Sequence, residues 1–425
     1  MEAGLNIQAI KGVKDILPGE VEVWQYIENK ARSVFETYGF SEIRAPIFEY
    51  TELFSRSIGE TTDIVEKEMY TFEDTTGKKI TLRPEGTAPV VRAYIEHQLY
   101  NKAHITKLYY FGPMFRHERP QAGRYRQFYQ IGAEVFGIDS PILDAEILSM
   151  LNNLMEAIDV KGLDLQLNSL GCKDCRPKYK DALKQFLKDK HPLLCENCQR
   201  RMDRNPLRVL DCKGKTCKDA VTDAPVILDY LCDGCKKHFD KVKETLNTLK
   251  VTYSMNPRLV RGLDYYTKTT FELVSTNLGA QNAVAAGGRY DGLVEELGGP
   301  KTPGIGFAIG MERLASLMQK DNFKTNKPDV FIATLGDKAK DVSVSLMDSL
   351  REKGVKAETD YEDASLKSQM RKADRLGARY VLIIGEDEIK KGSALLRDMG
   401  AKTQEEIDIN TLAELLMEKV APLSL

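Results

Sequence analysis

The 425-residue sequence lacks the features that mark membrane-spanning and exported proteins. It contains no apolar run of about 18 residues, which a transmembrane helix would need. Its first residues, MEAGLNIQAIKGVKDILP, lack a basic stretch followed by an apolar block, so no signal peptide is indicated. We therefore expect a cytosolic (cytoplasmic) protein without a membrane partner.

Two common nucleotide-binding loops are also missing. No segment fits GxxxxGK[ST], and the glycine spacing of GIGFAIGMERL, residues 304–314, does not fit GxGxxG. The net charge of −2 gives no sign of a nucleic-acid binder. Residues 172–250 nevertheless hold 19 Lys and Arg against 12 Asp and Glu, a locally basic segment that is compatible with RNA binding. Random scatter of charge is the alternative interpretation.

The composition, 42% hydrophobic and 29% charged, is typical of a globular protein with two or three domains. A composition break at Lys327 and Pro328 predicts domains over residues 1–326 and 327–425. Within the first domain, residues from about 171 to 256 are Lys-rich and largely helical, and we interpret them as an insertion. Beyond the break, alternating strand and helix patterns over residues 330–384 predict an α/β domain with a partly parallel sheet.

The N-terminal region shows simple local patterns. Apolar spacing predicts a helix over residues 20–38, followed by a strand over 41–48. Pro46 interrupts that strand and places it at a sheet edge or an interface. A hairpin over residues 69–82 leads into the loop RPEGT, where we expect Thr87 to cap a helix that starts at Ala88.

The most informative stretch is FGPMFRHERPQAGRYRQFYQIGAEVF, residues 111–136. Its second half alternates, so that Phe128, Gln130 and Glu134 share the face opposite the core residues. An aromatic ring, an amide and a carboxylate beside several arginines form poor core material and good pocket material. Arginine forks suit phosphate oxygens, and an aromatic ring can stack on a base. The alternative is an exposed, charged hairpin.

These segments resemble a known family. FRHERP followed by RQF resembles motif 2 of class II aminoacyl-tRNA synthetases, and GIGFAIGMERL resembles their motif 3. Three segments resemble the histidyl-tRNA synthetases in particular: the full sequence of residues 111–136, RGLDYYT at 261–267 and AAGGRYD at 285–291. The helix and Pro-containing strand at 20–48 are similar to motif 1, which forms the dimer interface. Residues 327–425 resemble an anticodon-binding domain.

The resemblance covers essentially the whole chain and implies an α/β fold with an antiparallel catalytic sheet. It implies ATP-dependent ligation of L-histidine to tRNA(His) through a histidyl-adenylate, with release of pyrophosphate and AMP. Mg²⁺ with ATP and a homodimer are further implications. The alternatives are a non-catalytic regulatory subunit of ATP phosphoribosyltransferase and a non-catalytic RNA-binding protein on the same fold.

The family's functional residues fall on matching positions of this sequence. Arg116 and Arg261 are the implied catalytic residues at the α-phosphate, and the glycines before Arg289 are expected to let the backbone pass close to substrate. The implied ATP-binding residues are Arg116, Glu118, Arg124, Phe128 and Arg313. The implied histidine-binding residues are Glu85, Thr87, Gln130, Glu134, Tyr265 and Tyr266. For Glu85, a carboxylate that favours the start of a helix is the alternative interpretation.

All eight cysteines lie in the lysine-rich segment. They form three CxxC pairs and one CxxxxC pair: Cys172 and Cys175, Cys195 and Cys198, Cys212 and Cys217, Cys232 and Cys235. Disulfides are rare in cytosolic proteins. The spacing is typical of tetrahedral zinc sites, and two sites of four thiolates would use every sulfur. Reduced cysteines packed among helices are the alternative.

Overall fold

The computed structural model describes residues 7–59, 62–121, 123–279, 282–318, 323 and 327–420. The chain forms two compact units, Met1–Lys320 and Asp321–Leu425. Each unit has its own sheet and its own hydrophobic core. In the described ranges, none of the helices combines the length and the apolar character that crossing a membrane would need.

The first unit is built on an eight-stranded sheet with the order β1-β5-β6-β11-β10-β9-β7-β8. The six central strands are antiparallel, as expected, and only the short edge strands β1 and β8 pair in parallel in this sheet. The strands are β1 Ser41–Glu42, β5 Thr106–Phe115, β6 Gln127–Phe136, β7 Leu163–Ser169, β8 Ser254–Met255, β9 Thr267–Ser275, β10 Ala283–Arg289 and β11 Gly304–Gly310.

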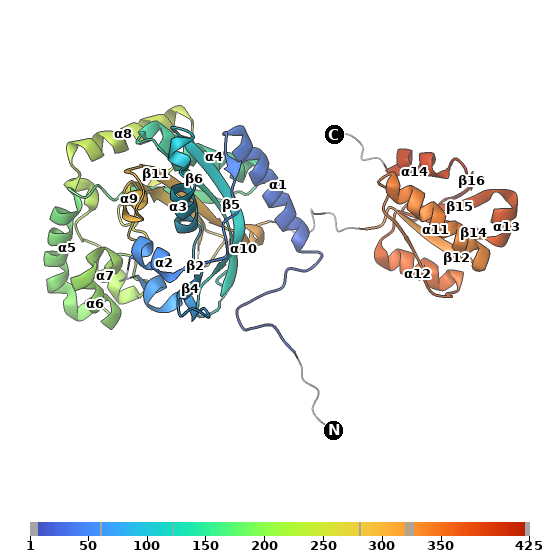
Figure 1. Cartoon of the computed structure of the whole chain (residues 1–425), viewed down its shortest axis with the longest axis horizontal. Coiled ribbons are helices and arrows are strands. Elements are labelled where there is room, and N and C mark those ends of the chain that lie inside the picture. Colours follow the sequence, from blue (N-terminus) through green and yellow to red (C-terminus); the bar gives the residue numbers. More distant parts are fainter. Residues whose placement is uncertain are drawn as a thin grey trace, which may run out of the picture. The chain divides into compact units, whose positions relative to one another are not determined.

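One face of this sheet is packed against helices. These are α1 Val21–Thr37, α4 Pro141–Ala157 and α10 Met311–Ser316. The ring of Phe35 in α1 lies 5.3 Å from that of Tyr109 in β5 and 6.1 Å from that of Phe307 in β11. Trp24 meets Tyr129 of β6 edge-on at 5.2 Å. The predicted core face of residues 127–136 is therefore confirmed, and Figure 1 shows α1 running beside β5 on this side of the sheet.

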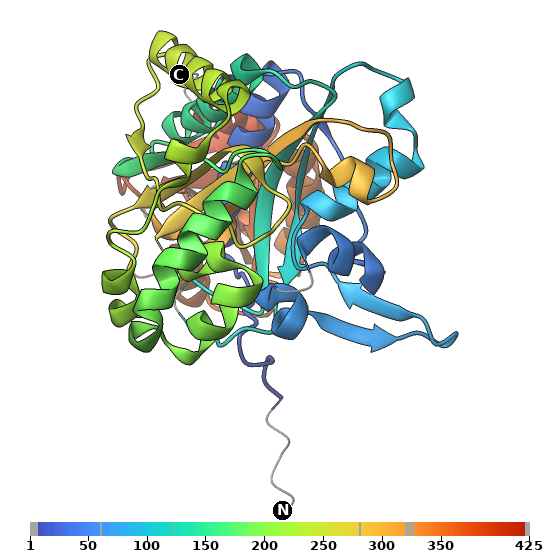
Figure 2. The same cartoon turned by 90° about the vertical axis from the view of Figure 1, so that its left-hand side faces the viewer.

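The opposite side carries shorter elements. They are helices α2 Thr51–Ile58, α3 Thr87–Glu96 and α9 Leu293–Glu296, the turns η1 Ile64–Glu68 and η2 Leu99–Asn101, and strands β2 Phe48–Tyr50, β3 Tyr70–Glu73 and β4 Lys79–Leu82. The last three form a small antiparallel sheet, from which the β3–β4 hairpin, blue in Figure 2, projects.

The single strand predicted over residues 41–48 is wrong. The chain forms β1 in the large sheet and β2 in the small one, with Pro46 between them. Proline has no N–H to donate to a sheet ladder, so the chain leaves the large sheet before this residue.

Residues 171–256, the cysteine-rich segment, are largely helical as predicted. The elements are α5 Arg176–Lys190, α6 Glu196–Arg204, α7 Lys215–Ala220 and α8 Asp233–Thr248, with the turns η3 His191–Leu193, η4 Pro206–Val209 and η5 Ile227–Tyr230. Helices α5, α6 and α7 share a small core that includes Tyr179, Leu183, Leu187 and Met202. In Figure 1 these three helices lie together beside the large sheet, on the side away from α1.

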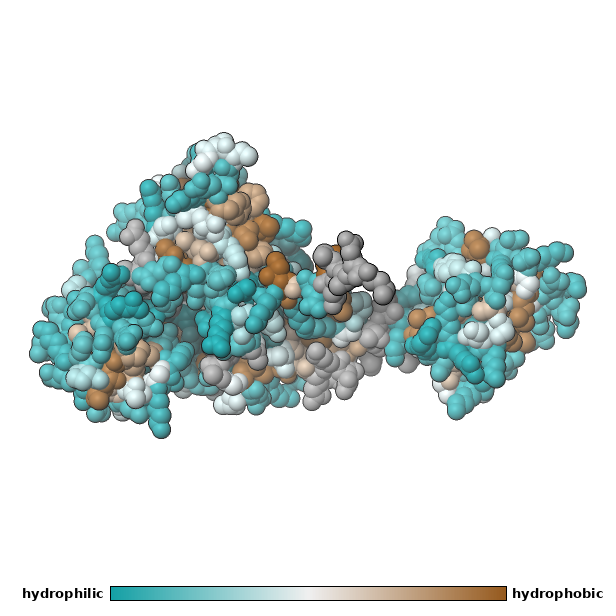
Figure 3. Space-filling model, turned by 90° about the horizontal axis from the view of Figure 1, so that it is seen from below, coloured by the Kyte–Doolittle hydropathy of each residue, from teal (hydrophilic) through white to brown (hydrophobic). Residues whose placement is uncertain are grey.

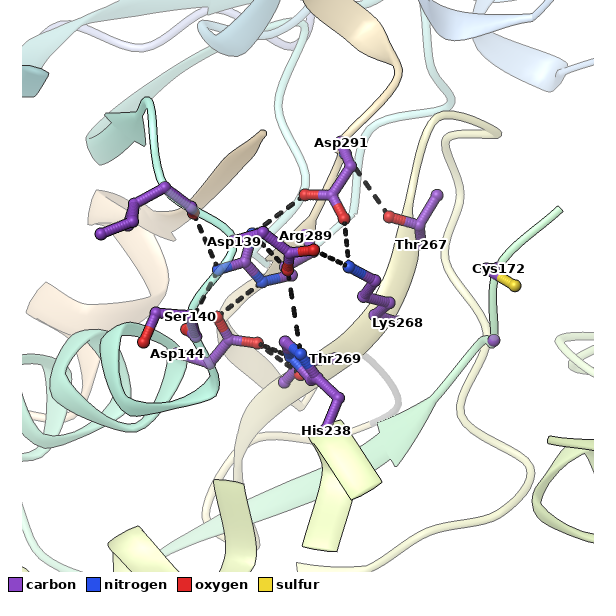
Figure 4. A network of polar contacts seen from close by, with 12 residues as sticks. Asp139, Ser140, Asp144, Cys172, His238, Thr267, Lys268, Thr269, Arg289 and Asp291 are labelled. Atoms are coloured by element: carbon purple, nitrogen blue, oxygen red, sulfur yellow. Dashed lines mark hydrogen bonds and ion pairs between the residues drawn. The ribbon is translucent and has the colours of Figure 1, made fainter. Parts of the chain in front are cut away.

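A buried polar network ties α8 to the sheet (Figure 4). The carboxylate of Asp144 in α4 accepts hydrogen bonds from Arg289 Nε at 2.7 Å and from Thr269 Oγ1 at 2.6 Å. His238 Nε2, from α8, lies 2.9 Å from the same carboxylate. Arg289 also donates to Asp291 at 2.9 Å. Because Asp144 and Arg289 are fully buried, the network joins four elements around one desolvated ion pair.

The second unit contains a five-stranded sheet with the order β13-β12-β14-β15-β16. Its first three strands are parallel, which confirms the predicted strand–helix alternation, and the antiparallel strands β15 and β16 were not predicted. The strands are β12 Val330–Leu335, β13 Ala357–Thr359, β14 Tyr380–Gly385, β15 Ser393–Asp398 and β16 Gln404–Asp408. The helices are α11 Asp337–Glu352, α12 Leu366–Leu376, α13 Glu386–Lys391 and α14 Leu412–Val420.

Candidate active site

A cavity of about 520 Å³ opens in the first unit, on the polar side of β6. Eleven of the twelve residues carried over from the resemblance line it: Glu85, Thr87, Arg116, Glu118, Arg124, Phe128, Gln130, Arg261, Tyr265, Tyr266 and Arg313. The twelfth, Glu134, lies fully buried next to Thr87. Four separate stretches of sequence, residues 85–87, 116–134, 261–266 and 313, therefore meet at one place.

The RPEGT loop is fixed by Arg83. This side chain donates through Nε to the carbonyl of Pro113 and through Nη1 to that of Ala45, both at 2.9 Å. The buried Glu85 carboxylate then accepts from the N–H groups of Thr87 at 2.6 Å and of Ala88 at 2.8 Å. Glu85 thus satisfies the first N–H groups of α3, and the prediction that Thr87 is the cap is wrong. Burial raises the pKa of Glu85.

Glu134 lies in a cluster of hydroxyl groups. Its carboxylate accepts from Thr87 Oγ1 at 2.7 Å, from Tyr290 Oη at 2.5 Å and from Tyr110 Oη at 3.5 Å. Burial raises the pKa of Glu134 to about 8. A carboxyl group whose pKa lies close to neutral pH can either accept or donate a hydrogen bond. This property suits a ligand with ring nitrogens that also titrate near neutral pH.

The sequence interpretation missed Tyr110 and Tyr290. A strand-register argument was available for Tyr110, because it lies directly opposite Gly132 across the β5–β6 pair. A Cβ atom on Gly132 or on Gly86 would lie within 2.5 Å of the Tyr110 ring or hydroxyl. The two glycines therefore make room for a tyrosine that reaches Glu134.

The arginines enter the cavity from different elements. Arg116 donates through Nε to the Pro84 carbonyl at 2.9 Å, and its guanidinium lies 5.2 Å from the centre of the Phe128 ring. Arg124 pairs with the buried Glu118. Arg313, at the start of α10, donates to the carbonyls of Gly123 at 3.0 Å and Ala283 at 2.7 Å. Three guanidinium groups in one cavity form a strong anion site.

The guanidinium of Arg261 is held in place by neighbouring side chains, but one of its hydrogen-bond donors is unused within the part of the chain that the structure describes. Its Nη1 pairs with Glu272, and the guanidinium lies 5.6 Å from the centre of the Tyr266 ring. Among the described residues, Arg261 Nε and Gln130 Oε1 are buried without a hydrogen-bond partner. A buried polar atom left unpaired costs about 1–3 kcal/mol, so a polar ligand that pairs with both atoms gains affinity.

The glycines before Arg289 have a packing role. A Cβ atom on Gly287 would lie 2.2 Å from the carbonyl oxygen of Gly306 in the neighbouring strand β11. A Cβ atom on Gly288 would lie 2.6 Å from the carbonyl oxygen of Thr269 in β9. These glycines therefore let strands pass close to one another, and the expected close approach to substrate stays a prediction. Arg289 itself belongs to the buried network with Asp144.

The cysteines gather in two groups of four. In each group all four sulfur atoms lie within 4.8 Å of one another. We call Cys172, Cys175, Cys232 and Cys235 the base group, and Cys195, Cys198, Cys212 and Cys217 the cavity group. The second name reflects that Cys195 and Cys212 line the cavity described above.

Comparisons with known proteins agree with this architecture. Residues 12–314 match the family model of histidyl-tRNA synthetase, and residues 329–419 match that of the anticodon binding domain. The chain is 54% identical over 415 residues to the histidine–tRNA ligase of Syntrophotalea carbinolica, covering 98% of this chain and 99% of that protein. It is 57% identical over 403 residues to that of Geobacter sulfurreducens, covering 95% and 97%.

A solved structure is also similar. The ligand-free histidyl-tRNA synthetase of S. aureus superposes with a TM-score of 0.81 at 39% identity, covering 96% of this chain and 99% of that one. The antiparallel sheet and the arginine-lined cavity thus define an aminoacyl-tRNA synthetase. The chain belongs to the histidyl-tRNA synthetase family.

Proposed function

We propose that this protein is a histidine–tRNA ligase that joins L-histidine to tRNA(His) in two steps. The histidine carboxylate attacks the α-phosphorus of ATP, and histidyl-adenylate forms as pyrophosphate leaves. The 3′-terminal ribose hydroxyl of the tRNA then attacks the adenylate carbonyl, and AMP leaves. The observation that carries the proposal is the meeting of arginine, aromatic and carboxylate side chains from four sequence stretches in one cavity.

The first step needs the phosphates neutralised and the attacking carboxylate held in line. Arg116 and Arg261 are proposed for the α-phosphate, and Arg124 and Arg313 for the γ-phosphate. The unpaired Nε of Arg261 supports its role, because this donor has no partner among the described residues. Mg²⁺ bound to ATP would offset part of the triphosphate charge.

The adenine base is assigned to Phe128 and Glu118. Phe128 offers a ring face for stacking, and Arg116 already lies beside that ring. Glu118 is paired with Arg124, so its proposed contact with the adenine amino group requires the carboxylate to serve both partners. A carboxylate has two oxygens and about four acceptor sites, which allows this.

Histidine is assigned to the deeper part of the cavity. Glu134 and Tyr266 would bind the imidazole, and Glu85, Thr87, Gln130 and Tyr265 would surround the α-amino group. Glu85 already accepts two backbone N–H groups, which leaves acceptor sites on its carboxylate for an ammonium ion. A site of buried polar partners rejects amino acids that cannot pair with them.

The other partners follow from the same proposal. Residues 327–425 would bind the tRNA anticodon, residues 1–326 would form the catalytic domain, and the protein would act in the cytoplasm. The proposal also includes structural Zn²⁺, one ion for each group of four cysteines. The non-catalytic regulatory subunit is not favoured, because histidine–tRNA ligases match this chain over nearly their whole length.

We further propose a homodimer. Phe48, Tyr50 and Phe72, on the small sheet, are about half exposed, at 52%, 54% and 49%. These side chains lie on β2 and β3, the two outer strands of the small sheet, and exposed aromatic side chains gathered on one sheet are typical of protein interfaces. The face of the molecule drawn in Figure 3 is mainly hydrophilic, with apolar residues in separate patches. Light scattering of the purified protein tests this state.

The direct test is ATP–pyrophosphate exchange with each of the twenty amino acids in turn. We expect exchange with histidine alone and its loss in Arg261→Ala. Exchange with no amino acid would overturn the proposed activity.

A further inference from the structure

The spacing of the sulfur atoms fits one tetrahedral ion in each group. Four thiolates at about 2.3 Å from Zn²⁺ would lie about 3.8 Å from one another. In the base group Cys172 Sγ lies 3.6 Å from Cys175 Sγ and 3.9 Å from Cys232 Sγ. In the cavity group Cys195 Sγ lies 3.9 Å from Cys212 Sγ. The described cysteines form no disulfide.

Backbone N–H groups also point at the sulfurs. The N–H of Cys195 donates to Cys217 Sγ at 3.2 Å, and that of Gly214 to Cys212 Sγ at 3.4 Å. In the base group the N–H of Cys232 donates to Cys175 Sγ at 3.1 Å. Donation to sulfur favours the thiolate, which is the form that binds metal. Cysteines that merely pack in a core do not need this pattern.

The two groups close different loops. The base group joins the start of the cysteine-rich segment to the start of α8. The cavity group joins Cys195 and Cys198 to Cys212 and Cys217, and so encloses α6 and η4. Helix α6 has nine residues and α7 has six. Helices this short are marginal in water, so the enclosed segment depends on packing and cross-links.

The segment enclosed by the cavity group contacts the proposed catalytic loop. Arg208, which is buried, donates through Nη1 to the carbonyl oxygen of Arg261 at 3.0 Å, and its Nη2 lies 3.5 Å from Asp63. Asn205 Nδ2 donates to Asp264 Oδ1 at 3.0 Å. Arg261 and Asp264 both belong to the RGLDYYT segment at residues 261–267. A charge-assisted hydrogen bond to the backbone of Arg261 limits where its guanidinium can lie.

We infer that the cavity group binds Zn²⁺ and that this ion holds Arg208 against the backbone of Arg261. Arg208 is then a positioning residue, and the cavity-group ion supports the active site from outside the reacting atoms. The base-group ion is purely structural. The kinetic part of this inference rests on the proposed function, whereas the metal part does not.

The test starts with the zinc content of the full-length protein, purified without added metal. We expect two zinc ions per chain by elemental analysis, one for each group of four sulfurs. Cys195→Ser with Cys212→Ser should remove one ion, and so should Cys172→Ser with Cys232→Ser. These two double variants are matched, because each changes one exposed and one half-buried cysteine.

Kinetics of histidine-dependent ATP–pyrophosphate exchange separate the two roles. The cavity-group variant should lose kcat, whereas the base-group variant should keep more of its kcat and lose thermal stability. Arg208→Ala should keep both zinc ions and lose about 10- to 100-fold in kcat, with little change in the histidine KM. Arg208→Lys should restore part of the kcat, because an ammonium ion can still donate to the Arg261 carbonyl.

The outcomes are distinct. A folded protein without zinc, or one holding iron, overturns the metal part. Wild-type kcat in Arg208→Ala, or equal loss of kcat in the two double variants, overturns the positioning role. If wild-type protein lacks exchange with every amino acid, the proposed function fails instead, and the zinc content still tests the metal sites.

Discussion

Glu134 is a carboxyl group that the fold has removed from water and surrounded with hydroxyls. Burial raises its pKa to about 8, above the value near 4.5 of the unfolded chain. Its contribution to stability is therefore fully present below about pH 4.5 and is lost as the pH rises through about 8. Glu134→Gln does not titrate. We expect wild type to lose stability relative to this variant between about pH 5 and pH 8, measured by urea unfolding. Parallel pH curves would contradict the raised pKa.

Gly306 limits the space around the same carboxylate. A Cβ atom there would lie 1.8 Å from Glu134 Oε2 and 2.6 Å from the carbonyl oxygen of Ala133. Gly306→Ala must therefore displace Glu134, and we expect the histidine KM in pyrophosphate exchange to rise by about tenfold or more. Gly292→Ala is the matched control, because nothing lies within 4 Å of its Cβ position. An unchanged KM in Gly306→Ala would show that Glu134 does not contact histidine.

At the scale of elements, the buried network around Asp144 locks α8 to the sheet. Asp144→Ala leaves the guanidinium of Arg289 buried with only its weaker partners, and breaking such a pair costs about 3–5 kcal/mol. We expect a loss of this size in the unfolding free energy from urea denaturation. Glu244→Gln, at an exposed ion pair on the same helix α8, should change little. Equal effects would mean that the network is not what anchors α8.

The sequence predicted the helices and strands better than it predicted the contacts between side chains that are distant in the chain. Apolar periodicity located α1, β6 and the alternation of strand and helix after residue 328, because burial of one face leaves a local pattern. The network around Arg289 and the contact of Arg208 with Arg261 join residues that are far apart in the chain and carry no such pattern. The motifs indicated the cavity residues one by one, whereas the capping role of Glu85 depends on backbone geometry that spacing alone does not fix.

At the scale of the whole molecule, the two units have separate cores. Buried residues such as Val330, Leu350, Leu382 and Leu412 form a cluster that lies entirely within the second unit. The cavity residues, from Asp63 to Arg313, all belong to the first unit. We therefore expect adenylate formation to need no side chain from the second unit, and a tRNA that contacts both units to gain affinity from two contacts.

A chain that ends at residue 326 tests this division. We expect it to stay folded by circular dichroism and to keep histidine-dependent pyrophosphate exchange near the wild-type kcat, because every cavity residue is retained. Charging of tRNA(His) at limiting tRNA should fall by about 100-fold or more, since one of two linked contacts is lost. Higher tRNA concentrations should recover part of this loss if the second unit supplies affinity alone. A folded truncated chain without exchange would show that the second unit supports the active site, and undiminished charging would show that it does not bind the tRNA.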